Sequence, residues 1–111
     1  MLEEPDPDQG PVLVTLKYVI DPAKAPEFLH QIYKYQRVRR RDGATRWGVF
    51  SDTEAPDVYL ESFQVDSWVE HQRQHDRFTL ADRELEKRVL GYSLKPVEVK
   101  HYIYARERLR R

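Results

Sequence analysis

Three side chains able to bind or react lie within the segment SWVEHQRQH: Trp68, His71 and His75. His71 and His75 are four residues apart, the spacing at which two side chains share one face of a helix and at which helical metal ligands occur. The H-x-x-x-H pattern lacks the glutamate that a zinc protease carries beside its first histidine, and the chain contains no cysteine. The pattern therefore favours a solvated or helix-capping pair, and we predict no metal site.

Further aromatic candidates lie in stretches where apolar residues alternate, as they do in strands. They are Tyr18, Trp47 and His101. A tryptophan at a helix start and a histidine among apolar strand neighbours are more often structural residues of the core. The residues by themselves therefore complete no catalytic set.

Glu61 alternates with Tyr59 and Phe63 in an otherwise apolar strand pattern. A carboxylate in that position could be a pH-sensitive or catalytic group if it is buried. The pattern favours a simpler interpretation, an ion pair with Arg46 or Lys100 at an interface between two copies of the chain.

An arginine run, RVRRR over residues 37–41, ends the first expected helix. Cationic side chains suit the negative end of a helix dipole, so the run favours a solvated helix terminus. The 19 basic and 19 acidic side chains cancel to a formal charge of zero. Nucleic-acid-binding domains usually carry a net basic footprint, so we predict no nucleic-acid partner.

These candidates are positioned by elements that the pattern of apolar residues predicts. Period-2 alternation indicates strands, while helical spacing after Asp21-Pro22, Ser67 and Thr79 indicates helices. The expected strands are 12–20, 44–51, 58–65 and 97–105, and the expected helices are 22–41, 67–76 and 79–91. This order predicts an α+β, ferredoxin-like fold with a four-stranded antiparallel sheet and helices on one face. A flexible acidic arm (1–11) and a basic tail (106–111) flank the domain (12–105).

The face of the sheet without helices is expected to carry apolar side chains. Candidates are Leu13, Val19, Tyr59, Phe63 and Val65, or their neighbours if the register shifts by one residue. Burial of such a face against a second copy removes apolar surface from water. We therefore predict a homodimer formed through the open sheet face.

Longer segments carry a family resemblance. ESFQVDSWVEHQRQH resembles the antibiotic-biosynthesis-monooxygenase-like superfamily of dimeric α+β barrels. Together with GPVLVTLKYVIDP and VRRRDGATRWGVFSD, it is similar to the cytosolic C-terminal domain of major-facilitator-type exporters, the transmembrane secretion effector group. The resemblance covers about residues 10–105. It implies covalent attachment to a membrane transporter domain, a cytoplasmic location, and a linker role for residues 1–11.

The same resemblance bears on activity. Haem-degrading members of the superfamily use an asparagine, a tryptophan and a histidine. Trp68 and His75 match the last two and are the candidates for catalysis that the resemblance implies, but this chain contains no asparagine. The resemblance therefore implies no haem and no other cofactor.

The expected function is a non-catalytic dimerising or small-molecule-sensing accessory domain. The alternative is a cofactor-independent monooxygenase acting on a small aromatic, quinol-like substrate. Superfamily members of that kind bind flat aromatic substrates in a pocket between the sheet and the helices. For such a pocket the resemblance implies a ligand-binding set of Tyr18, Trp47, Trp68, His75 and His101.

Overall fold

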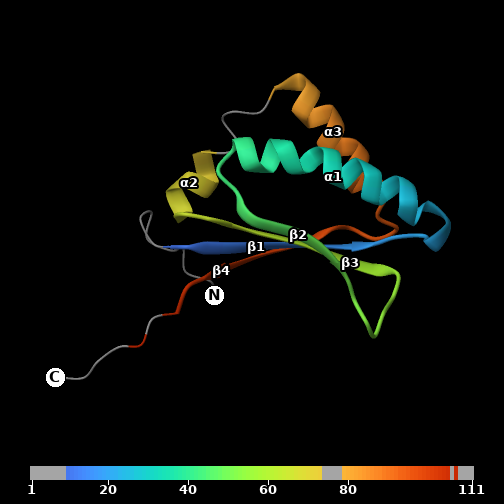
Figure 1. Cartoon of the computed structure of the whole chain (residues 1–111), viewed down its shortest axis with the longest axis horizontal. Coiled ribbons are helices and arrows are strands. Elements are labelled where there is room, and N and C mark those ends of the chain that lie inside the picture. Colours follow the sequence, from blue (N-terminus) through green and yellow to red (C-terminus); the bar gives the residue numbers. More distant parts are fainter. Residues whose placement is uncertain (1–9, 74–78, 106, 108–111) are drawn as a thin grey trace.

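The computed structural model describes residues 10–73, 79–105 and 107. Its elements are β1 (Val12–Val19), a 3₁₀ turn (Pro22–Lys24), α1 (Ala25–Arg41), β2 (Thr45–Ser51), β3 (Val58–Val65), α2 (Trp68–Arg73), α3 (Leu80–Gly91) and β4 (Glu98–Ile103). The strands form one antiparallel sheet in the order β2-β3-β1-β4. The helices cover one face of this sheet (Figure 1). The predicted α+β, ferredoxin-like fold is confirmed.

The helices begin at the capping residues that the sequence predicts. The side chain of Asp21 accepts a hydrogen bond from the Ala23 amide at 3.0 Å, so the chain enters a 3₁₀ turn before regular α1. Thr79 and Asp82 form both hydrogen bonds of a capping box at the start of α3. After α1, Gly43 has φ of 100°, a conformation that glycine adopts without a Cβ clash.

The core lies between α1 and the helix-facing side of β1 and β3. The even-numbered residues of β1 are buried, as their alternation predicts, and α1 contributes side chains one turn apart. The main buried side chains are Val12, Val14, Leu16, Tyr18, Phe28, Ile32, Tyr35 and Phe63.

The register of β3 differs from the expectation for the open face. Phe63 pairs with Val14 and Val65 with Val12, and all four are buried beneath the helices. Tyr59 lies on the same side, with its ring centroid 5.6 Å from that of Phe28. The assignment of these three β3 residues to the open face is therefore wrong. In register with Leu13 and Val19 of β1, the open face instead carries their neighbours Val58, Leu60, Ser62 and Gln64.

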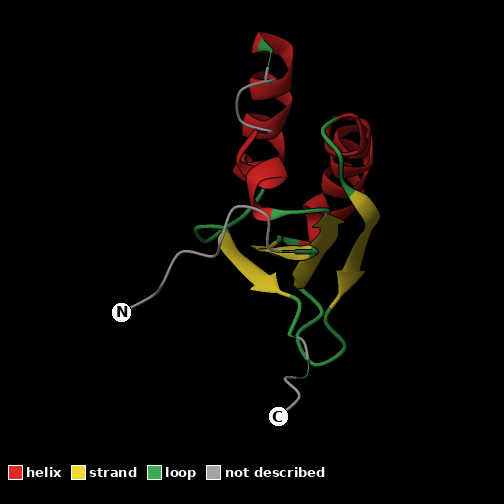
Figure 2. Ribbon diagram, turned by 90° about the vertical axis from the view of Figure 1, so that its left-hand side faces the viewer, coloured by secondary structure: helices red, strands yellow, loops and turns green. Residues whose placement is uncertain are grey.

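Helix α3 packs on α1 and makes few contacts with the sheet. Its first turn stands away from the strands and its last turn descends toward them (Figure 1 and Figure 2). The helix-facing side of β4 consequently has little cover, and Val99 there is 50% exposed. The slope of α3 leaves a hollow between α3 and β4.

The predicted short helix after Ser67 is present as α2, and the Glu70 amide donates to the Ser67 hydroxyl at 3.2 Å. Its expected continuation to residue 76 lies outside the described residues. No helix in the described ranges has the length and apolar character needed to cross a membrane.

Candidate functional site

The hollow beneath α3 is an open pocket of about 650 Å³. Its floor is the helix-facing side of the sheet, and its walls are α3 and the connection from α3 to β4. Apolar lining comes from Val14, Leu16, Phe63, Leu90, Leu94, Pro96, Val97 and Val99, and polar lining from Arg39, Glu86, Ser93, Lys95 and His101. Concave, mostly apolar pockets of this size with a few polar groups are typical of small-molecule sites.

A buried polar network adjoins this pocket through Arg39, which belongs to both. Glu61 of β3 is fully buried and accepts from Nε and Nη2 of Arg39 at 2.9 and 3.1 Å. It also accepts from the Tyr18 hydroxyl at 2.9 Å and from Trp47 Nε1 at 2.8 Å. An ionised carboxylate has about four lone-pair directions, so these four bonds satisfy it completely.

Trp47 reaches Glu61 through the regular alternation of β2. Val49 pairs with Glu61, which faces the helices, so Trp47, two residues earlier in the strand, lies on the same side of the sheet. The pairing of β2 with β3 shifts register between Thr45 and Gly48. This bulge puts Thr45, and not Trp47, out of phase with the rest of the strand.

Arg39 is held on three sides. Its guanidinium carbon lies 4.6 Å from the Tyr35 ring centroid and 4.8 Å from that of Phe63, while Glu61 binds two of its nitrogens. Stacking against two rings and a bidentate carboxylate suits the planar guanidinium. The side chain is only 14% exposed, so Arg39 belongs to the core as well as to the pocket wall.

The network perturbs the pKa values of its members. Burial raises the pKa of the Tyr18 hydroxyl, and the nearby charge of Glu61 raises it further. Burial alone would lower the pKa of Arg39, but the charge and hydrogen bonds of Glu61 outweigh that effect and raise it. Burial likewise raises the pKa of Tyr35, whose hydroxyl donates to Glu86 at 3.0 Å. Arg39 is therefore a permanent cation, and both phenols stay protonated in the folded state.

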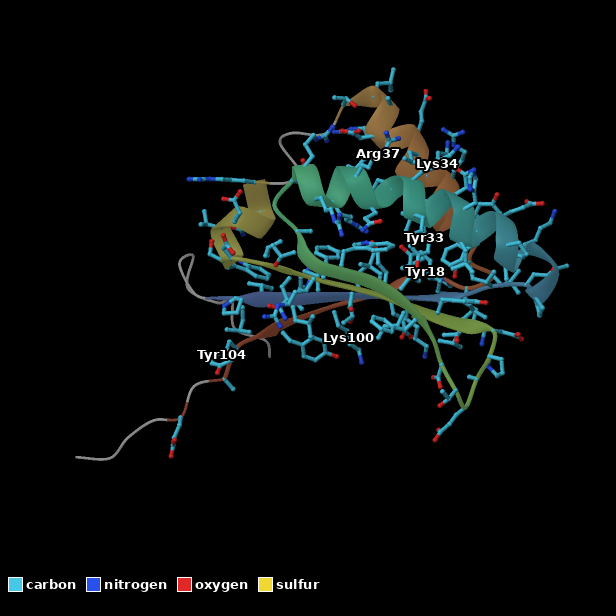
Figure 3. The ribbon with its side chains drawn as sticks, viewed as in Figure 1. Tyr18, Tyr33, Lys34, Arg37, Lys100 and Tyr104 are labelled. Carbon is cyan, nitrogen blue, oxygen red and sulfur yellow. The ribbon has the colours of Figure 1, made fainter. Side chains whose placement is uncertain are left out.

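Two expectations about charged residues need correction. Glu61 faces the helices and pairs with Arg39, so the expected ion pair with Arg46 or Lys100 is wrong. Figure 3 shows Lys100 on the opposite side of the sheet from Tyr18, which lies beneath α1. The arginine run is also not uniformly solvated, because the side chain of Arg39 is mostly covered by its neighbours. Arg41, half-exposed, pairs with Asp82 at 2.6 Å and joins α1 to α3.

The structure brings the predicted ligand-binding residues together in pairs. Tyr18 and Trp47 meet on Glu61, while the rings of Trp68 and His101 make an edge contact with centroids 5.4 Å apart. Of these residues, only His101 lines the pocket. His75 lies outside the described residues. In the described ranges, no group of three or more His, Asp or Glu side chains is arranged to hold a metal ion.

Arg39 and Glu86 line the pocket but are not among the site residues predicted from the sequence. A signal for Arg39 was present, because it continues the buried helical series Phe28, Ile32 and Tyr35 at the spacing of one α1 face. An arginine at a core position requires a buried anion, and Glu61 is the charged residue in the centre of an apolar strand.

Several solved structures from other organisms share this fold. A candidate antibiotic biosynthesis monooxygenase from Caulobacter crescentus superposes with a TM-score of 0.75 at 14% identity, covering 90% of this chain and 94% of that one. A second from Bordetella bronchiseptica gives 0.73 at 17%, covering 87% and 99%. Rv0793 from Mycobacterium tuberculosis gives 0.70 at 13%, covering 88% and 98%. At these identities the similarity concerns the fold.

Sequence comparison is more specific. None of the curated proteins matches this chain. The family model described as transmembrane secretion effector matches residues 1–109, which is nearly the whole sequence. The chain therefore belongs to the transmembrane secretion effector family.

Proposed function

We propose that this chain is a non-catalytic accessory domain that binds a small apolar molecule and forms a homodimer as the cytosolic part of a membrane exporter. The observation that carries the proposal is the open pocket of about 650 Å³, whose lining is mainly apolar. A pocket of this kind provides binding energy through burial of apolar surface.

The polar groups beside the pocket support binding rather than catalysis. A general base needs a lone pair directed at its substrate, and the four hydrogen bonds to Glu61 use the lone pairs of that carboxylate. The raised pKa of Tyr18 keeps its phenol neutral, so it supplies no nucleophile. The network instead holds β1, β2, β3 and α1 in position around the cavity.

Dimer formation is proposed through the open sheet face. Phe50, Leu60 and Tyr102 on this face are 58%, 37% and 47% exposed, and Leu13 and Val19 are partly exposed between them. Exposed apolar side chains gathered on one face of a sheet are typical of a protein interface. A second copy of the same sheet presents the same apolar side chains, so pairing would remove both sets from water.

Ligand binding is tested with the neutral probe 4-phenylbutanol, followed by amide chemical shifts in NMR spectra. We expect saturable shifts at pocket residues and at least about tenfold weaker binding by Val99→Trp, which fills the pocket. The matched control is Leu80→Trp, since Leu80 is 74% exposed on α3 and does not line the pocket. Absence of saturable binding, or equal binding by Val99→Trp, would contradict the proposal.

Attachment to an exporter rests on family membership and is tested in the native organism. An antibody against the domain should detect a polypeptide much larger than the 13.3 kDa of this chain, sedimenting with the membranes. A 13.3 kDa protein in the supernatant would exclude the exporter part of the proposal.

The second candidate is a cofactor-independent monooxygenase acting on a quinol-like compound. It is favoured by His101, which lines the pocket and contacts the ring of Trp68. This candidate predicts oxygen consumption with a panel of hydroquinones, lost in both His101→Ala and Trp68→Phe. Oxygen uptake no faster than in buffer would leave the accessory domain as the function.

A further inference from the structure

One charged group in the pocket has no charged partner in the part of the chain that the structure describes. Glu86 lies in the middle of α3, lines the pocket and is partly buried. Its Oε2 accepts from the Tyr35 hydroxyl at 3.0 Å, which orients the carboxylate. Its Oε1 receives no hydrogen bond, and no cation lies within ion-pair distance, among those residues.

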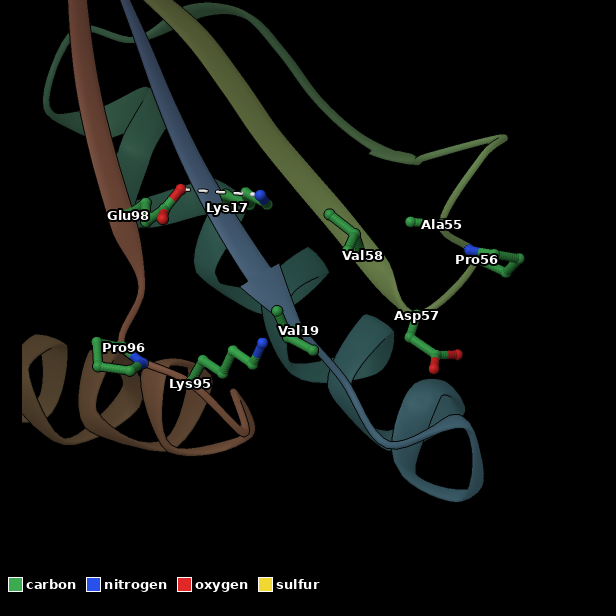
Figure 4. Close-up of a pocket in the computed structure, with 9 residues that line it drawn as sticks. All are labelled: Lys17, Val19, Ala55, Pro56, Asp57, Val58, Lys95, Pro96 and Glu98. Atoms are coloured by element: carbon green, nitrogen blue, oxygen red, sulfur yellow. Dashed lines mark ion pairs between the residues drawn. The ribbon is translucent and has the colours of Figure 1, made fainter.

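The two cations that line the pocket do not neutralise Glu86. The charge of Arg39 is balanced by Glu61 through two hydrogen bonds at 2.9 and 3.1 Å. Lys95 is exposed, and its side chain runs toward Val19 along a second hollow of about 380 Å³ on the other side of the connection (Figure 4). Among the described residues, the carboxylate of Glu86 is therefore a charge in the pocket that no ion pair compensates.

The apolar surroundings of Glu86 strengthen the attraction of its carboxylate for a cation. Leu90 lies one turn further along α3 and lines the same pocket, so the carboxylate stands at the edge of an apolar wall. Val97 and Val99 continue that wall on the other side. Charges interact more strongly where apolar walls exclude water than they do in open solvent.

We propose that the pocket selects apolar molecules that carry one protonated amine, with the ammonium group on Glu86 and the apolar body against Leu90, Val97 and Val99. This inference rests on the proposed ligand-binding function and adds the class of ligand. An anionic ligand in the same pocket would lie beside the unneutralised carboxylate and bind more weakly.

Three probes with the same apolar body test the inference: 4-phenylbutylamine, 4-phenylbutanol and 4-phenylbutyrate. Each is titrated into the wild-type protein at about pH 7, where the amine is protonated and the acid ionised, and followed by amide chemical shifts. We expect the amine to bind at least about tenfold more tightly than the alcohol, and the carboxylate more weakly than the alcohol. This comparison needs no variant and so does not depend on the folding of one.

Variants then locate the selectivity. Glu86→Gln should bind the amine no more tightly than the alcohol. Glu84→Gln is the matched control, because Glu84 is exposed on the same helix and does not line the pocket. This control should retain the full preference for the amine. Tyr35→Phe, which removes the hydrogen bond to Glu86, should reduce the preference only in part.

The possible results distinguish a wrong class of ligand from a wrong binding function. If the alcohol binds in the pocket but the amine binds no better, the ligand class is wrong and the binding function stands. Preference for the amine that survives in Glu86→Gln would also overturn the assignment to this carboxylate. If none of the three probes binds, the proposed binding function itself fails.

Discussion

At the scale of single residues, the buried Glu61 explains how a charged network can occupy the core of a small domain. Desolvation of a carboxylate and a guanidinium is costly, and their attraction compensates only when every polar atom has a partner. Arg39, Tyr18 and Trp47 provide those partners from three different elements. Removing the charge of either Glu61 or Arg39 alone should therefore destabilise the fold more than removing both charges together.

The ion pair between Glu61 and Arg39 can be tested by the stability of its variants. Glu61→Gln leaves the Arg39 charge buried without a counter-ion and should lower the free energy of unfolding by about 3–5 kcal/mol. Adding Arg39→Met removes the stranded charge, while the new amide at position 61 would accept from Trp47 Nε1 through its oxygen and donate to the Tyr18 hydroxyl through its nitrogen. The double variant should therefore be more stable than Glu61→Gln alone, measured by urea denaturation. A double variant that is less stable than either single variant would contradict this account.

At the scale of elements, α3 depends on its connection to α1, since it has few contacts with the sheet. Arg41 at the end of α1 binds Asp82 at 2.6 Å, and Asp82 also completes the capping box with Thr79. One carboxylate thus both starts α3 and joins it to α1. Since α3 forms the wall of the pocket, this contact also maintains the cavity.

The contact predicts a pH dependence of stability. Hydrogen bonds from Arg41, and then from Thr79, lower the pKa of Asp82 in the folded state. A lowered pKa stabilises the fold above the unfolded value of about 3.9, and that contribution disappears as the pH falls through the folded value. Asp82→Asn should therefore be less stable than wild type near neutral pH, with the difference shrinking in acid. Urea denaturation at a series of pH values, from neutral to about pH 2, measures this.

Glu84→Gln serves as the control for the pH experiment, because this exposed residue lies on the same helix and makes no ion pair with the residues described. It should follow the wild-type pH profile. A stability difference between wild type and Asp82→Asn that is the same at every pH would rule out a role for the Asp82 charge.

At the scale of the whole molecule, the two faces of the sheet differ in what covers them. One face supports the helices and the pocket, and the other presents Phe50, Leu60 and Tyr102 to solvent. Dimer formation through the second face would leave the pocket of each copy open on the outside. Binding and pairing can then be altered independently.

We therefore expect a charge introduced on the open sheet face to disrupt the dimer, and a charge introduced on α3 to leave it intact. Leu60→Glu, on the open face, should convert a dimer into a monomer of 13.3 kDa in sedimentation equilibrium, because the new carboxylate must lose its hydration when the interface forms. Leu80→Glu is the matched control, since Leu80 is equally apolar but lies on α3. A monomeric wild type, or a dimer that persists in Leu60→Glu, would exclude this interface.

Much of the fold was determined by the sequence alone, because its signals are local. Alternation identified the strands to within two residues at each end, and Asp21, Thr79 and Gly43 marked where helices begin or end. These signals depend on neighbours within a few positions, so one chain is sufficient to interpret them.

Only the tertiary structure decided the site. Arg39 and Glu61 are 22 residues apart, and they meet because the register of β3 turns Glu61 toward α1. The pairing of β2 with β3 sets Val49 opposite Glu61, and so places Trp47, two residues earlier, on the same side of the sheet as this carboxylate. The slope of α3 then opens the pocket and places Glu86 beside it. Register, bulges and helix orientation arise from packing between distant segments, which residue spacing in one sequence does not encode.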